Sequence, residues 1–530
     1  MIAYFSMEIG LESDIKTYSG GLGILAGDIL RTAADIGVPY VGVTLIYQSG
    51  YFRQILEENG EQHAIDDEWV PSEKMKKIDD FVEIKIKGDV FKISAWLYEI
   101  KGKKGVVPVY FLDTGDDYLT RYLYMGNREY RFQQEMVLGI GGYRLLKKLG
   151  YDIKVYHMNE GHSALLSLEL LKEQGDIEKV KRKCAFTTHT PVPAGHDIFD
   201  YEIVKENLPE EDAKLVNKIM GDKELNMTLL AMKLSGYINA VSKRHHEVTK
   251  EMFKGFDINY ITNGVHSYTW TSRYFAELYD KYIPEWKEDP ENLQKVDVIP
   301  DEEIWEAHKN AKRDLIKFVE EKTKVKLSED IFTVVFAKRM TKWKRGYLIF
   351  KDIEKLKEIG RGKLQIIFAG KAHPYDEEGK EVIMKIFEGI KKLKGDIKCV
   401  YLKNYDIDMA KYFVSGADLW LQMPLPPYEA SSTSGMKAAH NGVPLLSTLD
   451  GWWCEGRREE ENGWTIEDGN DDMAAKSLYE KLKDIMKIYY GDRKKWIKVM
   501  KGAIKYTASR FNTHRVLKEY LNAFKKYLLT

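Results

Sequence analysis

The chain has 530 residues, enough for roughly two to four domains of ordinary size. Hydrophobic residues make up 44% of it and charged residues 31%, which excludes a disordered chain, a fibrous protein and a membrane-embedded protein. Its 81 lysines and arginines nearly cancel 82 aspartates and glutamates, so the net charge of −1 favours neither nucleic acid nor an anionic membrane as a partner.

Cysteine usage and the first residues indicate a reducing compartment. The three cysteines, Cys184, Cys399 and Cys454, lie far apart, so neither a disulfide framework nor a zinc ribbon is expected. The N-terminus carries no basic stretch and soon meets Glu8, which is unlike a signal peptide. No apolar run reaches the ~18 residues of a membrane-spanning helix. We therefore expect a cytoplasmic protein.

Short β-branched runs alternate with longer segments of helical period in both halves of the chain. This pattern predicts βα units around parallel sheets. The strands expected in the first half are 38–47, 106–113, 153–159, 184–189 and 258–264. Those expected in the second half are 331–337, 364–370, 397–402, 417–423 and 443–447. We predict an α/β protein with two doubly wound, Rossmann-like domains, each with its binding edge at the carboxyl ends of its strands.

The stretch 267–300 marks the join between these domains, because it is rich in Trp, Tyr, Glu and Pro and has no clean period. We expect the first domain to span residues 1–267 and the second to span 268–504. Residues 505–530 have apolar side chains at helical spacing, which predicts a terminal helix that packs back toward the first domain.

The first candidate site is a glycine turn. The residues Gly20-Gly21-Leu22-Gly23 lead into an apolar helical segment, where glycines allow backbone N–H groups to approach a phosphate closely. An isolated glycine cluster is more often an ordinary turn. Its spacing also fits neither a P-loop nor G-x-G-x-x-G, which disfavours a standard nucleotide site.

A basic run is the second candidate. Residues 338–345 follow an expected strand and contain five cations in eight positions. Such a run is ordinarily a solvated face. Cations at the carboxyl end of a parallel strand, however, project into the binding edge, where Arg and Lys can neutralise a phosphate.

The third candidate is the hydroxyl-rich segment 428–442. A carboxylate, Glu429, precedes the turn, and Lys437 stands in the second turn of the helix that follows. These groups suit sugar hydroxyls, a phosphate and a carbonyl cofactor. The alternative is a Ser/Thr-rich helix cap with an exposed lysine.

Polar residues also end three expected strands of the first half, at 159–162, 187–190 and 262–264. A single polar strand end is more often a satisfied cap than a ligand. Three ends at one sheet edge favour a binding site.

Taken together and in this order, these segments resemble the α-glucan phosphorylases of glycogen, starch or maltodextrin, in a short form. The clearest match is E-A-S-S-T-S-G-M-K at 429–437 followed by Asn441, where the family has E-A-S-G-T-G-N-M-K and then N. The resemblance implies a glycosyltransferase-B fold and retaining phosphorolysis of α-1,4-glucan from the non-reducing end, which releases α-glucose 1-phosphate. It also implies a pyridoxal 5′-phosphate cofactor whose phosphate acts in proton transfer, a homodimer, and no metal.

The resemblance assigns groups for the cofactor and the phosphates. It implies that Lys437 links covalently to the cofactor, and that Thr433 and Gly21 contact the cofactor phosphate. Lys344 binds the same phosphate, and Arg339 binds the substrate phosphate. The residues expected to act in catalysis are Lys437, Arg339, Lys344 and His189.

The same resemblance assigns the sugar. Glu429 and the backbone of Ser431 and Ser432 hold the glucose 3- and 4-hydroxyls. His189, in T-H-T, and Asn263, in T-N-G, lie beside the 6-hydroxyl. The other residues expected to contact substrate are Gly20, Leu22, Tyr405 and Lys338.

The sequence departs from the family pattern at two places. Ser432, Ser434 and Gly435 replace G, G and N. Asp406 stands where many members have an arginine after N-Y, and the cations expected to compensate are Lys342 and Arg345.

Two other functions stay open. A retaining glucan synthase of the same fold would use a nucleotide sugar and no pyridoxal phosphate, and Met436-Lys437 followed by Asn441 argues against it. A non-catalytic glucan-binding subunit whose site has decayed is the second alternative, and four retained residues argue against it: Arg339, Lys344, Lys437 and His189.

Overall fold

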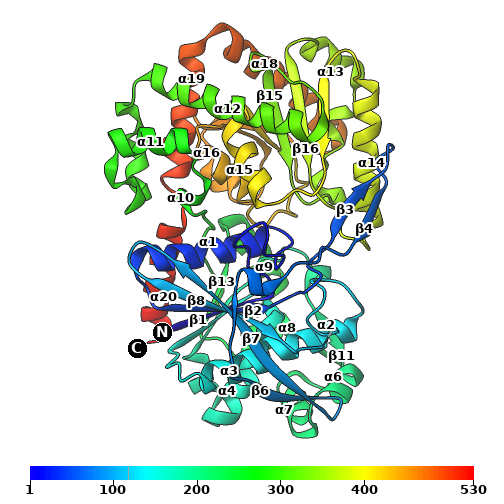
Figure 1. Ribbon diagram of the computed structural model, residues 1–530, viewed down its shortest axis with the longest axis vertical. Helices are drawn as coiled ribbons and strands as arrows, with labels where there is room; N and C mark the ends of the chain where they lie inside the picture. Colours follow the sequence, from blue (N-terminus) through cyan, green and yellow to red (C-terminus); the bar gives the residue numbers. More distant parts are fainter. Residues whose placement is uncertain (117, 530) are drawn as a thin grey trace. The chain divides into compact units, whose positions relative to one another are not determined.

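The computed structural model describes residues 1–116 and 118–529 (Figure 1). The chain forms two compact units. Unit 1 contains Met1–Phe52, Asp66–Thr262 and the chain from Val516 onward, and unit 2 contains Arg53–Ile65 and Asn263–Arg515. The division thus falls a few residues before the expected boundary at 267, and unit 1 also takes up the end of the chain.

Unit 1 is built on one large sheet. Its strands lie in the order β14-β13-β10-β9-β1-β2-β8-β7-β5, and β6 pairs with β7. Neighbouring strands between β14 and β8 in this order all pair in parallel, and β7 pairs with β8 antiparallel. The strands are β1 (Ile2–Ser6), β2 (Tyr40–Leu45), β5 (Lys76–Lys77), β6 (Val82–Ile86), β7 (Asp89–Lys101), β8 (Val106–Asp113), β9 (Val155–Asn159), β10 (Cys184–Thr187), β13 (Tyr237–Ala240) and β14 (Asn259–Tyr260).

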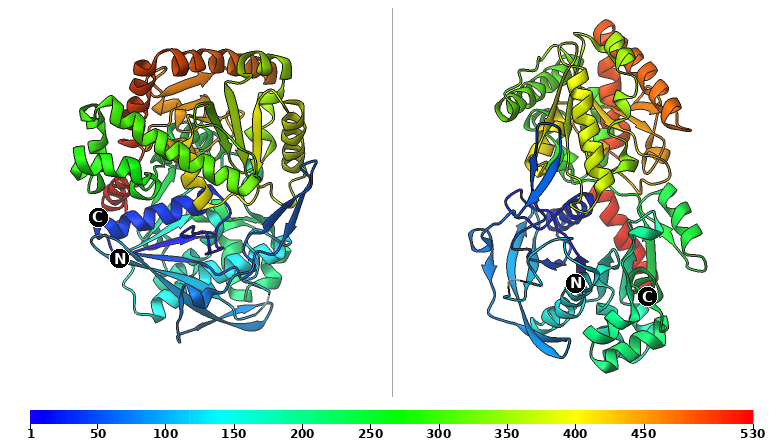
Figure 2. Two further views of the ribbon diagram at one scale, coloured as in Figure 1. Left: turned by 45° about the horizontal axis from the view of Figure 1, so that its top comes forward. Right: turned by 90° about the vertical axis from the view of Figure 1, so that its right-hand side faces the viewer.

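Helices cover both faces of this sheet (Figures 1 and 2). Along β1, Ile2 and Tyr4 pack into one apolar layer, and Ala3 and Phe5 into the other, as the alternation of a strand requires. The first layer includes α1 (Gly21–Ile36) and α20 (Thr513–Tyr527). The helices of the remainder of the unit are α2 (Arg128–Met136), α3 (Gly142–Lys148), α4 (Leu166–Gln174), α5 (Ile177–Lys181), α6 (Tyr201–Asn207), α7 (Glu210–Met220), α8 (Met227–Lys233) and α9 (Lys243–Met252).

The terminal helix differs in extent from the expected 505–530. Residues Ala503–Ala508 form a π-helical turn that belongs to unit 2, and α20 begins only at Thr513. From Val516 the helix packs in unit 1, where the Tyr520 hydroxyl lies 3.1 Å from Thr187 Oγ1 and accepts a bond of 3.2 Å from Asn239 Nδ2.

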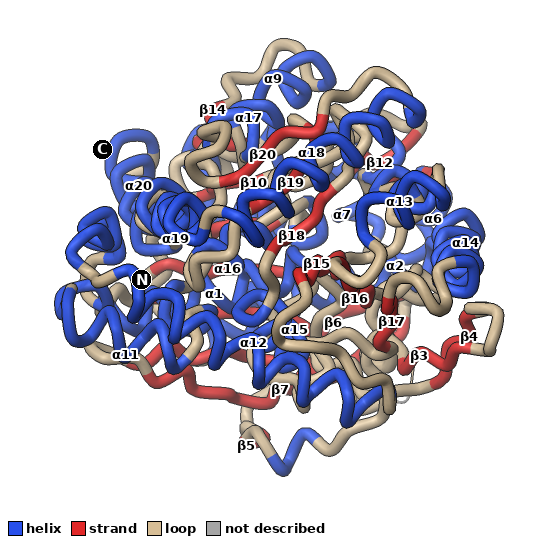
Figure 3. The backbone as a smooth tube through the Cα atoms, turned by 90° about the horizontal axis from the view of Figure 1, so that it is seen from above, coloured by secondary structure: helices blue, strands red, loops and turns tan. Residues whose placement is uncertain are grey.

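Unit 2 has a wholly parallel sheet in the order β17-β16-β15-β18-β19-β20. Figure 3 shows these strands in red, with α12 and α15 on one side and α18 on the other. The strands are β15 (Phe332–Ala337), β16 (Leu364–Ala369), β17 (Lys398–Leu402), β18 (Leu419–Gln422), β19 (Leu445–Thr448) and β20 (Gly463–Ile466). The main helices are α10 (Ser267–Trp270), α11 (Arg273–Tyr282), α12 (Asp301–Thr323), α13 (Ile353–Gly360), α14 (Glu377–Lys392), α15 (Ile407–Gly416), α16 (Ser434–Ala439), α17 (Trp453–Gly456), α18 (Asp471–Gly491) and α19 (Arg493–Gly502). Two doubly wound sheets confirm the predicted α/β class.

A hairpin from the first part of the chain belongs to unit 2 and was not predicted. It consists of β3 (Arg53–Leu56) and β4 (Gln62–Ile65). Buried Gln54 donates to the Gly370 carbonyl at 2.9 Å, and Gln62 Nε2 donates to the Ala372 carbonyl at 2.9 Å. These bonds hold the hairpin against the loop after β16.

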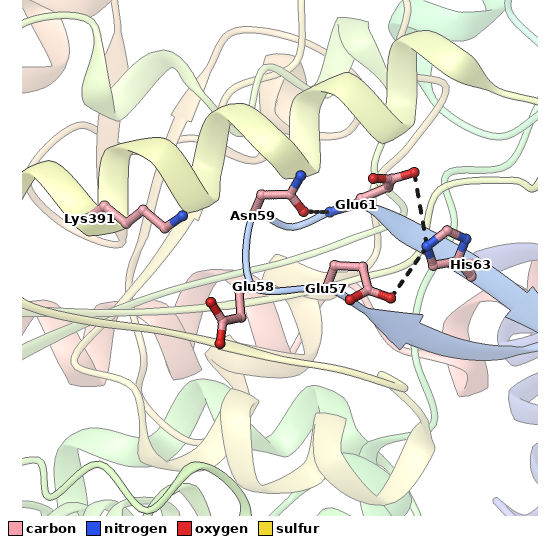
Figure 4. Close-up of a pocket in the computed structure, with 6 residues that line it drawn as sticks. All are labelled: Glu57, Glu58, Asn59, Glu61, His63 and Lys391. Atoms are coloured by element: carbon pink, nitrogen blue, oxygen red, sulfur yellow. Dashed lines mark hydrogen bonds and ion pairs between the residues drawn. The ribbon is translucent and has the colours of Figure 1, made fainter.

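The tip of this hairpin forms an open acidic pocket with α14 (Figure 4). His63 Nε2 lies 3.6 Å from Glu57 Oε1 and 4.0 Å from Glu61 Oε1, and all three side chains are half exposed. No helix of the described residues is long and apolar enough to cross a membrane.

Candidate functional site

The basic run after β15 separates into buried and exposed cations. Lys338, 7% exposed, directly follows the strand, and the exposed Arg339 comes next. Lys344 Nζ lies 2.5 Å from Glu429 Oε2. Arg339 makes no ion pair or hydrogen bond with any residue that the structure describes. Unit 2 therefore presents one unpaired guanidinium beside buried ammonium groups.

The segment 428–442 brings its carboxylate and its lysine to the same region. The Glu429 backbone N–H donates to Asp450 Oδ2 at 2.8 Å, which fixes the start of the turn. Lys437 on α16 is 8% exposed, and its Nζ lies 4.1 Å from the ring centroid of Trp270. Asn441 Nδ2 donates to the Trp270 carbonyl at 2.8 Å. The spacing of Lys437 and Asn441 thus lets one helical turn orient the lysine and its aromatic neighbour together.

Charge in this region is unbalanced. Burial, reinforced by Lys344 and Lys437, lowers the pKa of Lys338 to about 7, although Glu429 opposes the shift. Burial and the charge of Arg339 also lower the pKa of Lys344, again opposed by Glu429. The cations of this poorly solvated place thus outnumber the two carboxylates that act on them, Glu429 and Asp450, so a bound anion would stabilise their charged forms.

The Lys338 shift predicts a pH dependence of stability. Unfolded, this lysine keeps its proton up to about pH 10.4. Between pH 7 and that value the unfolded chain binds a proton that the folded chain lacks, so this group makes the free energy of unfolding rise with pH. Lys338→Met should flatten that rise in denaturant titrations from pH 7 to 9.5, without phosphate or cofactor. Equal slopes for wild type and variant would contradict the assignment.

The expected substitutes for the family arginine are engaged elsewhere. Asp406 caps α15 by accepting the Met409 N–H at 2.8 Å. Lys342 is exposed and bonds Glu378 at 2.6 Å. Arg345 is 2% exposed and donates to Asp468 Oδ2 at 2.6 Å. Arg345 is therefore fixed in the packing of the loop after β20, whereas Lys342 pairs with an exposed carboxylate at the surface.

The residues beside Asp406 have structural contacts too. Asn404 has a positive φ of 59° and accepts the Gln54 N–H at 2.6 Å. Tyr405 stacks on Phe413 with ring centroids 5.8 Å apart. The N-Y pair thus joins the hairpin to the start of α15.

The glycine turn of unit 1 lies at the start of α1. A Cβ built on Gly20 or Gly21 would meet nothing within 4 Å, and neither has a positive φ. Neither packing nor backbone geometry therefore requires glycine at these two positions. A ligand that approaches the backbone closely does explain them.

The turn is held by Glu8, a residue that the sequence did not single out for this role. Its Oε2 accepts the backbone N–H of Ser19 at 2.5 Å and of Gly20 at 3.1 Å. Gly23 makes room for it, because a Cβ there would lie 2.7 Å from Glu8 Oε2. These two N–H groups precede the first turn of α1, so Glu8 holds the glycine turn and does not cap the helix. Its place eleven residues before Ser19 was no local signal of this contact.

His189 follows β10, at the carboxyl edge of the large sheet of unit 1. Its Nε2 is 2.6 Å from Asn159 Oδ1, and its backbone N–H donates to Glu160 Oε2 at 2.7 Å. Burial lowers the pKa of His189 to about 3, so the ring is neutral and acts as a hydrogen-bonding group. Burial raises the pKa of Glu160 to about 7. Asn263 belongs to unit 2, where its carbonyl accepts from Arg515 Nη2 at 3.2 Å.

A second polar cluster in unit 1 was also missed. Glu135, His162 and Asp197 have ligand atoms within 4.8 Å of one another, a spacing that can hold a metal ion. Partly buried Arg131 already supplies positive charge there, with its Nε 3.9 Å from Asp197 Oδ2. Sequence spacing gave no sign of this cluster, because its members come from three separate segments.

The chain is similar to known proteins along nearly its whole length. The family model described as carbohydrate phosphorylase matches residues 6–103 and 196–529. The maltodextrin phosphorylase of Thermococcus litoralis is 38% identical, over 99% of this chain and 70% of its own length. The glycogen phosphorylase of Aquifex aeolicus is 36% identical, over 100% of this chain and 86% of its own length. An uncharacterised protein of Methanocaldococcus jannaschii is 31% identical over 99% of both chains.

Proposed function

Because the chain belongs to the carbohydrate phosphorylase family, we propose that it catalyses the reversible, retaining phosphorolysis of an α-1,4-glucan. It is an enzyme that would release α-glucose 1-phosphate from non-reducing ends. The observation that carries the proposal is the cluster of Lys338, Lys344 and Lys437, which are little exposed to solvent. The carboxylates Glu429 and Asp450 balance their charge only in part. Such a site is built for more negative charge than the protein itself supplies.

Pyridoxal 5′-phosphate fits unit 2. It needs a primary amine for covalent attachment and cations for its phosphate. Buried Lys437 and partly buried Lys344 are groups of these kinds. The Ser431 hydroxyl is buried and has no hydrogen-bond partner among the described residues, so a polar ligand would satisfy it. Thr433 and Gly21 would add backbone donors. When bound, the cofactor supplies a second phosphate that exchanges a proton with the substrate phosphate.

The protein's own groups then bind and orient the reactants. Arg339 and Lys338 hold the substrate phosphate, and the open backbone at Gly20 and Gly21 gives it a close approach. These cations hold the phosphate beside the anomeric carbon, where it stabilises a transition state of oxocarbenium character. No carboxylate nucleophile is required of the protein.

The sugar is held by neutral groups and by one carboxylate. Glu429 and the backbone of Ser431 and Ser432 bind the 3- and 4-hydroxyls. His189, neutral because its pKa is about 3, and Asn263 bind the 6-hydroxyl without adding charge near the phosphate. Leu22 and Tyr405 complete the proposed contacts, and the protein would act as a homodimer.

An assay in both directions tests the function. With maltodextrin and inorganic phosphate, the cofactor-loaded protein should accumulate α-glucose 1-phosphate, and with glucose 1-phosphate and a maltodextrin primer it should lengthen the glucan. Elongation from a nucleoside-diphosphate glucose, with none from glucose 1-phosphate, would instead support a synthase. A protein that binds glucan but turns over neither donor would be a binding subunit.

A further inference from the structure

Ser432 has a backbone conformation that is unusual for its residue type. Its φ is +69°, in the left-handed region where a Cβ is unfavourable and glycine is the ordinary choice. Glycine would adopt this conformation without the clash of a Cβ, so this chain keeps a strained serine where a strain-free residue is available. Its side chain must therefore contribute something that glycine lacks.

The Ser432 hydroxyl bonds the buried lysine of the basic run. Lys338 Nζ donates to Ser432 Oγ at 2.9 Å, and Ser432 Oγ donates to Gln422 Oε1 at 3.1 Å. Gln422, on β18, is 2% exposed, so it is a fixed acceptor. Lys338 forms no ion pair with any side chain in the described part of the chain.

The second serine that departs from the motif joins the same cluster. Lys338 Nζ lies 3.4 Å from Ser434 Oγ, which also accepts from Trp420 Nε1 and Gln422 Nε2 at 3.1 Å each. The two hydroxyls orient the ammonium group without neutralising it. A carboxylate in their place would cancel the charge that a phosphate needs.

We propose that Ser432 is a positioning residue that fixes the Lys338 ammonium group for the substrate phosphate, with Ser434 as its support. This inference rests on the proposed function. Burial lowers the pKa of Lys338 to about 7, which makes hydroxyl contacts useful because they accept from the charged form. The backbone strain at Ser432 is the cost of this placement.

Two substitutions separate strain from positioning. Ser432→Gly removes both the strain and the hydroxyl, and Ser432→Ala removes only the hydroxyl. In the cofactor-loaded enzyme, both should raise the KM for phosphate about fivefold to tenfold, because the bond between Lys338 and the phosphate is weakened but not lost. Ser432→Gly should raise Tm by about 1–3 °C, whereas Ser432→Ala should lower it.

Further variants test whether the effect passes through Lys338. In a Lys338→Met background, Ser432→Ala should have no additional effect on the phosphate KM, because its partner is gone. Additive effects would overturn the proposal. Ser415→Ala is the matched control, since this buried hydroxyl on α15 bonds only helical carbonyls and should leave the phosphate KM unchanged.

Isothermal titration with inorganic phosphate tests the positioning role of Ser432 separately from the proposed function. If wild type turns over glucan but both Ser432 variants bind phosphate as tightly as wild type, the positioning role is wrong and the proposed function stands. If wild type neither binds phosphate nor catalyses phosphorolysis, both are wrong.

Discussion

Lys437→Ala is expected to reduce phosphorolysis to the background of the assay and to abolish covalent cofactor binding. The lysine lies on α16, is 8% exposed and has its Nζ over Trp270. Its amine is therefore largely shielded from bulk water. Borohydride reduction of wild type should leave a pyridoxyl label on the peptide that contains Lys437, and the variant should stay unlabelled. The absorbance of bound cofactor should disappear with the label.

Lys437→Arg is the control for charge. It keeps a cation near Trp270 but cannot form the covalent link, so it should preserve the thermal stability better than alanine while remaining inactive. Full activity of either variant, or a wild-type label on another lysine, would refute the assignment of Lys437. Colourless wild-type protein that gains no activity with added pyridoxal phosphate would refute the cofactor itself.

Much of the fold was predictable, because strand and helix periods are local. Every expected strand of the second half overlaps an observed one, from β15 to β19. The missed strands include β1 and β13, which are only five and four residues long. Their role is visible only once β9 and β10 pair beside them. The β3–β4 hairpin was missed because its contacts with Gly370 and Ala372 are more than 300 residues away in sequence.

The motifs of the candidate site were predictable from the sequence, but the contacts of each side chain were not. Lys338, Lys342 and Arg345 read as equivalent cations in one basic run. The structure separates them, because Glu378 pairs with Lys342 and Asp468 with Arg345. Likewise the motif shows that Ser432 replaces a glycine, but only the backbone reveals that the serine keeps the conformation suited to glycine.

Arg339→Ala is expected to raise the KM for phosphate about 10- to 150-fold, which corresponds to about 1.5–3 kcal/mol for a charge-assisted hydrogen bond. The exposed guanidinium has no protein partner in the described residues, so the truncation breaks no internal contact and the fold should survive. The KM for glucose 1-phosphate should rise in parallel. The KM for maltodextrin should change little, because the groups proposed for the sugar are elsewhere.

Lys342→Ala tests whether position rather than charge decides this result. It removes one positive charge from the same run, so the long-range attraction of phosphate should fall as much as in Arg339→Ala. Lys342 is exposed and paired with Glu378, however, so no direct contact with the phosphate is lost. Steady-state kinetics at two ionic strengths should therefore show a loss for Arg339→Ala that persists in high salt and almost none for Lys342→Ala. Equal losses for the two variants would mean that the run acts only as a solvated positive face, and the assignment of Arg339 to the substrate phosphate would have to be abandoned.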